Sequence, residues 1–445
     1  MLNSKTLAAT LLIVVACNGY AKAQYGAQLT GVGAINRSMG GTSTAAPLDT
    51  LGAFQWNPAT ITALSNSVDM GVELLMPHSK LSSSVAPGSL GPGTPPIGFS
   101  GSTNSNSGTF PLPVMGFVYK PELSLPFGLE EMPITLGLGI LTVGGFGSNF
   151  PGSSSNPILM PPPPKGVGVG PIFAQYALMQ ILPTVAVQIT ERLSVGFSPI
   201  IDMATLSIDP GLLAAPDAAG GGFPTYPPLN NGTYQWGGGF QTGAFYKTDA
   251  NWQFGASFKS KQWFNNYQFN SHDQLGVARN IKVNVDAPMI VSLGTAYTGL
   301  EKILLALDVR YLDYGNTQPF SPSGYAPTGA FNGLGWNSIF ALSTGAQYEL
   351  SKAVSLRAGY SFNTNPIGNN DTFFNAATPL ILQQGVYFGS SYNVTERFKL
   401  SVAYAHFFRN STSGPWISGA GAIPGTSVTT TTSADTIIAS ASFLF

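Results

Sequence analysis

The feature that most constrains the fold is a strict alternation of apolar with small or polar residues, over segments of about ten residues. It is clearest at residues 354–363. One set of alternate positions there holds Val354, Leu356, Ala358, Tyr360 and Phe362. The positions between them hold Ser355, Arg357, Gly359, Ser361 and Asn363. Because successive side chains of a strand point to opposite faces, the segment predicts a strand with one apolar and one polar face.

The same alternation recurs along the last third of the chain. Residues 303–313 place Asp308 and Arg310 on one face and apolar side chains on the other. Residues 434–445 place Ile437 and Phe443 on one face. Strands of this length with one apolar face suit a tilted membrane barrel, in which the outer face meets lipid and the inner face is polar.

The composition supports a membrane location. Charged residues make up only 9% of the chain, whereas about 25% is usual for soluble domains. After the first 23 residues there is no apolar run long enough to form a membrane-spanning helix. We therefore predict an all-β fold, an antiparallel transmembrane β-barrel. The alternative is a secreted all-β protein.

Turn-rich connections divide the chain into 14 predicted strands, an even number that places both chain ends on one side of the membrane. The predicted strands are 67–80, 111–120, 133–148, 173–190, 193–208, 234–248, 251–263, 287–299, 302–314, 336–350, 353–364, 383–394, 396–409 and 434–445. Residues 264–286 form either a loop or an additional hairpin. Segments rich in Gly, Pro, Ser and Asn are predicted to be long outer loops: 81–110, 151–172, 210–233, 315–335, 364–382 and 410–433.

The first 23 residues have the features of a secretion signal peptide. Lys5 precedes an apolar run at 7–16, and the Ala-Lys-Ala sequence at 21–23 fits a cleavage site. The apolar run is too short to span a bilayer. We expect the mature chain to begin at Gln24. The alternative is a lipoprotein-type signal that would lipidate Cys17.

The charge and cysteine content of the predicted mature chain exclude two kinds of chemistry. It would contain 17 basic and 20 acidic residues, a net charge of −3, and so no basic footprint for nucleic acid. Cys17 is the only cysteine, so the mature chain could form no disulfide. A final strand that ends on Phe445 resembles the signal read by the barrel-assembly machinery of Gram-negative bacteria. We predict a bacterial outer-membrane protein surrounded by outer-membrane lipid.

Residues 24–62 differ from the rest of the chain. They are rich in Gly, Ala, Ser and Thr, and they show neither strand alternation nor a sustained apolar stripe. The segment ends in Asn57-Pro58-Ala59, a sequence that suits a turn. We predict that 24–62 is a hatch that plugs the lumen and that 63–445 forms the barrel.

This N-terminal segment resembles the hatch of the long-chain fatty acid outer-membrane transporter family (FadL/TodX type). The residues that carry the resemblance are Gly31-Val32-Gly33, Arg37 to Ala45, Asp49 and Asn57-Pro58-Ala59. Residues 307–311 and 356–366 are similar to the family as well. The chain departs from it at Thr60-Ile61, where members often have Gly-Leu.

The resemblance implies a monomeric 14-strand barrel that carries fatty acids or other hydrophobic compounds, such as hydrocarbons, inward without energy input. Outer loops would capture the ligand, and an apolar lumen pocket would receive it. The ligand would then leave sideways through a kinked third strand, here 133–148. We place the kink at Gly144-Gly145, because glycine weakens strand pairing. The alternative is that these glycines only reflect the abundance of glycine in the chain.

The sequence predicts no catalytic or metal centre and no cofactor, and so no enzyme. The histidines are His78, His272 and His406, and none belongs to a cluster with metal-ligand spacing. A Gly-x-Ser-x-Gly motif is also missing. His406 falls on the lipid-facing register of its strand, which is typical of an interfacial residue.

Three cations on inward registers are candidates to hold the carboxylate of a fatty acid: Lys259, Arg310 and Arg357. The alternative is that Arg310 or Arg357 forms an internal salt bridge with Asp308 or Glu349 that holds the barrel or the hatch, because buried charges are normally paired.

Apolar and aromatic residues outside the strands give a second set of ligand-binding candidates. Leu212, Leu213 and Phe223 lie in a predicted outer loop and could capture ligand, or pack loop against loop. Phe54 and Trp56 in the hatch could form the floor of the pocket, or wedge the plug against the wall.

Two other functions fit a barrel of this kind. One is a general diffusion porin, against which the scarcity of charge and the predicted plug both argue. The other is a surface adhesin or receptor that acts through its long outer loops.

Overall fold

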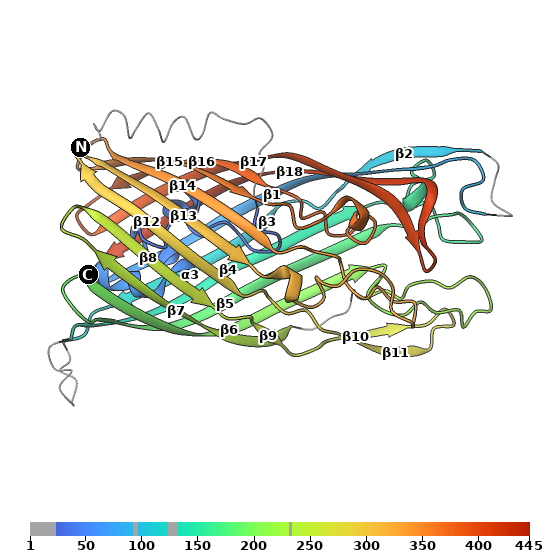
Figure 1. Cartoon of the computed structure of the whole chain (residues 1–445), viewed down its shortest axis with the longest axis horizontal. Helices are drawn as coiled ribbons and strands as arrows, with labels where there is room; N and C mark the ends of the chain where they lie inside the picture. Colours follow the sequence, from blue (N-terminus) through green and yellow to red (C-terminus); the bar gives the residue numbers. More distant parts are fainter. Residues whose placement is uncertain (1–23, 92–96, 123–131, 231–233) are drawn as a thin grey trace.

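The computed structural model describes residues 24–91, 97–122, 132–230 and 234–445. The predicted signal peptide and Cys17 lie outside these residues. Within them, 14 antiparallel strands pair in chain order, and the last strand pairs with the first to close a barrel. Figure 1 shows the barrel from the side, with the C-terminus at the end that carries the short turns and the long loops at the opposite end. The predicted fold class is therefore confirmed.

The strands of the barrel agree closely with the sequence alternation. They are β1 (Ser67–Val85), β3 (Phe110–Tyr119), β4 (Ile134–Phe150), β5 (Ile172–Gln188), β6 (Leu193–Asp209), β7 (Gln235–Lys247), β8 (Trp252–Lys259), β12 (Ile290–Leu300), β13 (Ile303–Leu312), β14 (Ile339–Glu349), β15 (Val354–Asn363), β16 (Gln384–Asn393), β17 (Phe398–Ser418) and β18 (Gly421–Leu444).

Three strand segments lie outside the barrel wall or extend it. Strand β2 (Phe99–Asn104) pairs with the far end of β1, and β9 (Trp263–Phe264) pairs with β7. Strands β10 (Tyr267–His272) and β11 (Ala278–Val283) form a separate hairpin. Of the two alternatives for residues 264–286, the hairpin is therefore the correct one.

The predicted loops 81–110 and 410–433 are wrong in part. Strand β1 continues to Val85, and β17 and β18 form one long hairpin that turns between Ser418 and Gly421. These extensions continue towards the end of the barrel that carries the long loops (Figure 1). Their outward residues are mostly Ser and Thr, so they lack the apolar face by which the membrane-spanning parts are predicted.

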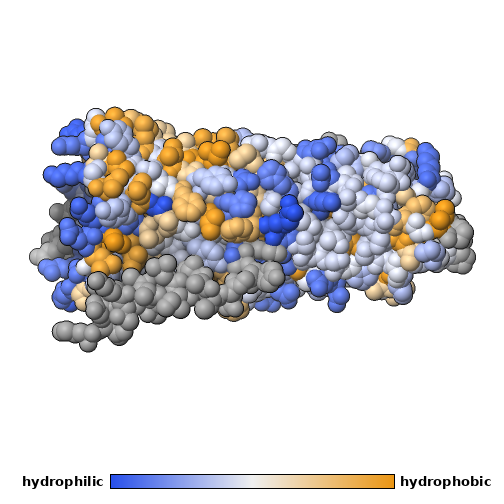
Figure 2. All heavy atoms as spheres, turned by 90° about the horizontal axis from the view of Figure 1, so that it is seen from above, coloured by the Kyte–Doolittle hydropathy of each residue, from blue (hydrophilic) through white to orange (hydrophobic). Residues whose placement is uncertain are grey.

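The two faces of the barrel differ as the alternation predicts. On β13, Asp308 and Arg310 are each 1% exposed, whereas Val309 between them is 44% exposed. Figure 2 shows hydrophobic side chains gathered in a band near the end with the short turns, with hydrophilic side chains at that end and mostly residues of intermediate hydropathy over the other half. The outer face therefore presents an apolar band to lipid.

The hatch fills the lumen with short helices. They are α2 (Ala34–Ser38), α3 (Thr50–Trp56) and η1 (Pro58–Ala63). The Asp49 side chain caps α3 by accepting a hydrogen bond from the Gly52 N–H. None of the helices in the described part of the chain is long and apolar enough to cross a membrane.

Hydrogen bonds and close backbone approach hold the hatch against the wall. Asn57 Nδ2 donates to the carbonyl oxygens of Thr44 and Ala244, at 2.7 and 3.0 Å. The hatch backbone at Gly40 lies so near β15 that a Cβ on Gly359 would be 2.2 Å from the Gly40 nitrogen. Glycine in this strand therefore permits the plug to fit.

Candidate functional site

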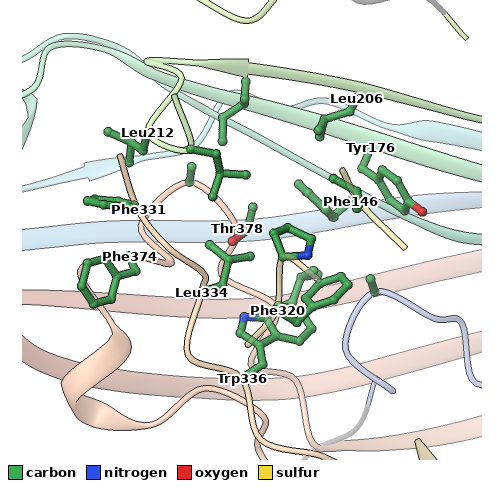
Figure 3. Close-up of a pocket in the computed structure, with 17 residues that line it drawn as sticks. Phe146, Tyr176, Leu206, Leu212, Phe320, Phe331, Leu334, Trp336, Phe374 and Thr378 are labelled. Carbon is green, nitrogen blue, oxygen red and sulfur yellow. The ribbon is translucent and has the colours of Figure 1, made fainter. Parts of the chain in front are cut away.

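An apolar cavity lies between the hatch, strands β4 to β6 and the outer loops (Figure 3). Phe146 of β4, Tyr176 of β5, and Leu206 and Ile208 of β6 come from the wall. The other lining residues are Ala27, Leu212, Leu213, Val285, Pro319, Phe320, Phe331, Leu334, Trp336, Phe374, Ala377, Thr378 and Leu380. Among the described residues, no charged side chain lines the cavity. It is the kind of concave, apolar site that binds hydrophobic molecules.

Aromatic contacts hold the loop side of the cavity together. The rings of Phe320 and Trp336 are 4.6 Å apart, and those of Phe331 and Phe374 are 4.7 Å apart. Trp336 Nε1 donates to Asn375 Oδ1 at 2.7 Å, which satisfies the polar end of the indole. The faces that remain towards the cavity are therefore apolar.

The cavity is narrow in this conformation, about 40 Å³. A cavity of roughly 150 Å³ is known to accept benzene. A ligand as large as an aromatic ring therefore requires the lining side chains to move. Most of the lining residues lie on connections rather than on strands. Because connections are more mobile than strands, we expect these side chains to move when a ligand binds.

Two outer-loop tyrosines near the cavity, Tyr226 and Tyr325, are neutral hydrogen-bond donors. The Tyr325 hydroxyl donates to the Ile417 carbonyl at 2.9 Å, and the Tyr226 hydroxyl donates to the Gly329 carbonyl at 3.2 Å. Burial raises the pKa of both phenols above the usual value. Both rings pack on Phe331 of the lining, so they add no charge next to the cavity.

The three candidate cations lie in the lumen but do not line the cavity. Arg310 Nη2 is 2.5 Å from Asp308 Oδ2, and its guanidinium carbon is 3.8 Å from the centre of the Trp56 ring. Asp308 Oδ2 also accepts the backbone N–H groups of Ser43 and Thr44 at 2.9 and 3.0 Å. Arg310 therefore belongs to an internal ion pair that fastens the hatch to β13.

Lys259 and Arg357 are held by neutral partners. Lys259 Nζ donates to Gln180 Oε1 at 3.0 Å. Arg357 donates to Gln347 Oε1 and to Ser391 Oγ, both at 2.6 Å. Gln347 Nε2 in turn donates to Glu349 Oε1 at 2.6 Å, so Arg357 is linked to Glu349 through Gln347 and not by a direct ion pair. A role of either cation in ligand binding stays a prediction.

The apolar candidates divide between the cavity and other places. Leu212 and Leu213 line the cavity. Phe223 is 55% exposed and lies outside its lining. Phe54 and Trp56 are buried, Phe54 against Gly137 and Gly139 of β4 and Trp56 against Arg310. These two hatch residues wedge the plug against the wall, and contact with ligand stays a prediction for all five.

The wall has a gap beside β4. Pairing of β3 with β4 stops at Val114 and Leu141, so the part of β4 that follows has no partner in β3, while its pairing with β5 continues on the other side. Between Thr142 and Gly144 the register against β5 shifts by one residue. Val143 is therefore an extra residue, and it lies directly before the predicted kink at Gly144-Gly145.

A second cavity opens at this gap. It is lined from β1 by Leu75, Pro77 and Ser79, and from β4 by Gly145, Phe146 and Gly147. The remaining lining residues are Gln24, Pro379, Leu380, Leu382, Thr432 and Ala434. Phe146 and Leu380 line both cavities. These two side chains therefore separate the central cavity from the gap in the wall.

Comparison with known proteins identifies the family. The sequence profile of the outer membrane protein transport protein family (OMPP1/FadL/TodX) matches residues 172–445. The chain belongs to this family. The match extends from β5 to the end of β18 and confirms the family resemblance of the sequence. The FadL/TodX family is one of outer-membrane transport proteins.

Solved structures share the whole fold. The toluene transporter TodX of P. putida matches with a TM-score of 0.66 and 19% identity, over 94% of this chain and 99% of that chain. A Pseudomonas aeruginosa FadL homologue matches with a TM-score of 0.68 and 14% identity, over 94% of this chain and 100% of that chain. At these identities the likeness concerns the fold alone. No curated protein sequence compared with the chain matches it.

Sequence reasoning missed most of the cavity. Phe320, Phe331, Leu334 and Trp336 come from one Gly- and Pro-rich connection, and Phe374 comes from the next one. Large apolar residues in a Gly- and Pro-rich segment are the signal that identified Leu212 and Leu213. The same signal is present in these two connections.

Proposed function

We propose that the chain is a passive outer-membrane transporter for hydrophobic compounds, and that uncharged hydrocarbons suit it better than long-chain fatty acids. The observation that carries the proposal is the apolar cavity between hatch and loops. Ligand captured at the outer loops would enter this cavity, as the predicted role of Leu212 and Leu213 requires. The protein would act as a monomer, assembled by the barrel-assembly machinery after cleavage of residues 1–23, with 24–62 as the hatch and 63–445 as the barrel.

The charge distribution supports the preference for uncharged ligands. A fatty acid in an apolar cavity needs a partner for its carboxylate, because an isolated buried charge is costly. The described lining offers none. Of the lumen cations, Arg310 is neutralised by Asp308, while Lys259 and Arg357 are engaged by other side chains.

The proposed exit is the gap beside β4. Phe146 and Leu380 line both the cavity and the gap, and both side chains are apolar. A hydrophobic molecule that leaves through the wall would enter the lipid directly and would avoid the polar lower lumen. The hatch supports this route, because it fills the path straight down the barrel. The same filling argues against a general diffusion porin.

The experiment compares uptake of two labelled compounds by cells that express the chain and lack other transporters of hydrophobic compounds. We expect toluene uptake to rise several-fold over cells without the chain, and oleate uptake to rise little. Uptake of oleate alone would overturn the preference for uncharged ligands. No increase for either compound, with correctly assembled protein, would overturn the transport function.

A cavity variant links uptake to the site. Leu206→Trp places a larger ring in the cavity and should abolish toluene uptake. Leu293→Trp is the matched control, because Leu293 is 58% exposed on the outer face of β12. Equal uptake by the two variants would show that ligand does not pass through the cavity.

A further inference from the structure

The outward residues of β1 and β18 change from apolar to polar at one level of the seam where these two strands pair. Below this level the outward residues of β1 are Val68, Met70, Val72, Leu74 and Met76, and above it they are His78, Lys80, Ser82 and Ser84. On β18 they change from Ile437, Ala439 and Phe443 to Asp435, Ser433 and Thr431. The border of the apolar band therefore crosses these strands at His78 and Asp435.

The height of this border fits the outer limit of the hydrocarbon. Strand β1 begins at Ser67, next to the hatch, and His78 follows on the same strand. At about 3.3 Å per residue and a tilt near 40°, the chain rises roughly 28 Å between them. The apolar band of such barrels is about 25 Å tall. His78 therefore lies at the level of the lipid headgroups on the side of the long loops.

A cluster of titratable side chains occupies the border. Asp435 Oδ1 is 2.8 Å from His406 Nδ1 and accepts the Tyr404 hydroxyl at 2.6 Å. Asp435 Oδ2 is 3.4 Å from His78 Nε2. All four side chains lie on the outward face, and His78 is 61% exposed. The carboxylate of Asp435 is therefore engaged by three neighbours on the protein itself.

Two permanent cations lie on the same outward surface. Lys80 is exposed two positions beyond His78, and Arg409 is exposed in the bulge of β17 that follows His406. Neither side chain has a hydrogen-bond or ion-pair partner among the described residues. Asp435 is the only acidic residue on the outward faces of β1, β17 and β18. Two permanent cations against one carboxylate leave this surface with a net positive charge.

We propose that this outward surface, formed by His78, Lys80, His406 and Arg409 around Asp435, binds the phosphorylated headgroup of an outer-leaflet lipid. Phosphate accepts charge-assisted hydrogen bonds from lysine and arginine. Basic residues at headgroup level attract anionic lipid. Asp435 orients the two imidazoles, whose remaining nitrogens supply further contacts. The bound lipid covers the β1–β18 seam that closes the barrel.

The test is native mass spectrometry of the full-length mature protein in mild detergent, with diphosphorylated lipid A as probe and its dephosphorylated counterpart as comparison. We expect the protein to retain the phosphorylated lipid about tenfold better, and Lys80→Ala/Arg409→Ala to lose most of that difference. Lys352→Ala/Arg397→Ala is the matched control, because it removes one exposed lysine and one exposed arginine from short turns at the other end of the barrel.

Several results of this experiment would overturn the proposal. Equal retention of both lipids, or undiminished retention by the Lys80→Ala/Arg409→Ala protein, would overturn the proposal. Equal loss in the control protein would also overturn it, because the effect would then follow net charge rather than this surface. Full displacement by millimolar inorganic phosphate would mean that the surface binds free phosphate and not a lipid. Heat-modifiable migration of each variant on gels establishes that its barrel is folded.

Discussion

The backbone N–H of Leu29 in the hatch donates to the carbonyl oxygen of Val143 in β4 at 2.8 Å. Gln28 also forms a β-bridge with Gly144. The hatch is therefore hydrogen-bonded to the extra residue of β4, at the edge that β3 leaves unpaired. This contact ties the plug to the gap through which we propose that ligand leaves.

Filling the gap should stop transport without emptying the cavity. Gly145 lines the gap but not the central cavity. Gly145→Leu should reduce toluene uptake to background while toluene still binds to the purified protein, as measured by isothermal titration calorimetry. Gly222→Leu is the control, because a Cβ there meets nothing within 4 Å. Unchanged uptake by the Gly145→Leu protein would exclude this exit.

Removing the extra residue should close the gap by another means. Deletion of Val143 lets β4 pair regularly with β5 on both sides of the deletion and removes the carbonyl that binds Leu29. We expect a folded barrel with little uptake of hydrocarbon. Uptake equal to that of the unmodified protein would mean that the irregularity in β4 has no part in release.

Shortening the side chain between the two cavities should widen the passage. Phe146 lines both cavities and stacks on Tyr176, with ring centres 5.7 Å apart. Phe146→Ala should raise the uptake of bulkier hydrocarbons several-fold relative to toluene. Phe340→Ala serves as the control, since Phe340 is 60% exposed on the outer face. If the uptake of toluene and of bulkier hydrocarbons falls in the Phe146→Ala protein but not in the Phe340→Ala protein, the ring guides ligand rather than blocks it.

Breaking the Asp308–Arg310 pair should loosen the hatch. Asp308→Asn leaves the buried guanidinium of Arg310 without its counter-charge, and such a loss costs about 3–5 kcal/mol. We expect a lower unfolding temperature and new ion conductance in planar bilayers. Asp249→Asn removes the exposed partner of Arg192 instead and should cost at most about 1 kcal/mol. Equal effects from the two variants would contradict the role given to Asp308.

The membrane part of the fold could be predicted because its two faces have different neighbours. Lipid selects apolar residues and the plugged lumen selects small or polar ones, so period-2 alternation marks each strand there. Beyond the membrane this contrast ends. Between 426 and 433 only Val428 is not Ser or Thr, and so β18 could not be distinguished from a loop.

The apolar cavity was less predictable than the barrel, because most of its lining lies on the connections between strands. The cavity depends on how residues 319–336 and 374–380 fold back over the hatch, and no periodicity reports that path. Alternation places Asp308 and Arg310 on the inward face, but the hydrogen-bond partners of Asp308, Ser43 and Thr44, are far away in sequence. The bulge at Val143 also reverses which residues of β4 point inward, so Phe146 faces the cavity only because of that extra residue.

The most direct measurement is anomalous diffraction from crystals of the protein soaked in bromobenzene. We predict a bromine peak in the central cavity, bounded by Phe146, Leu206, Leu334 and Trp336, with the loop side chains displaced to make room. A cavity that stays empty while bromine occupies only the outer surface of the barrel would contradict it.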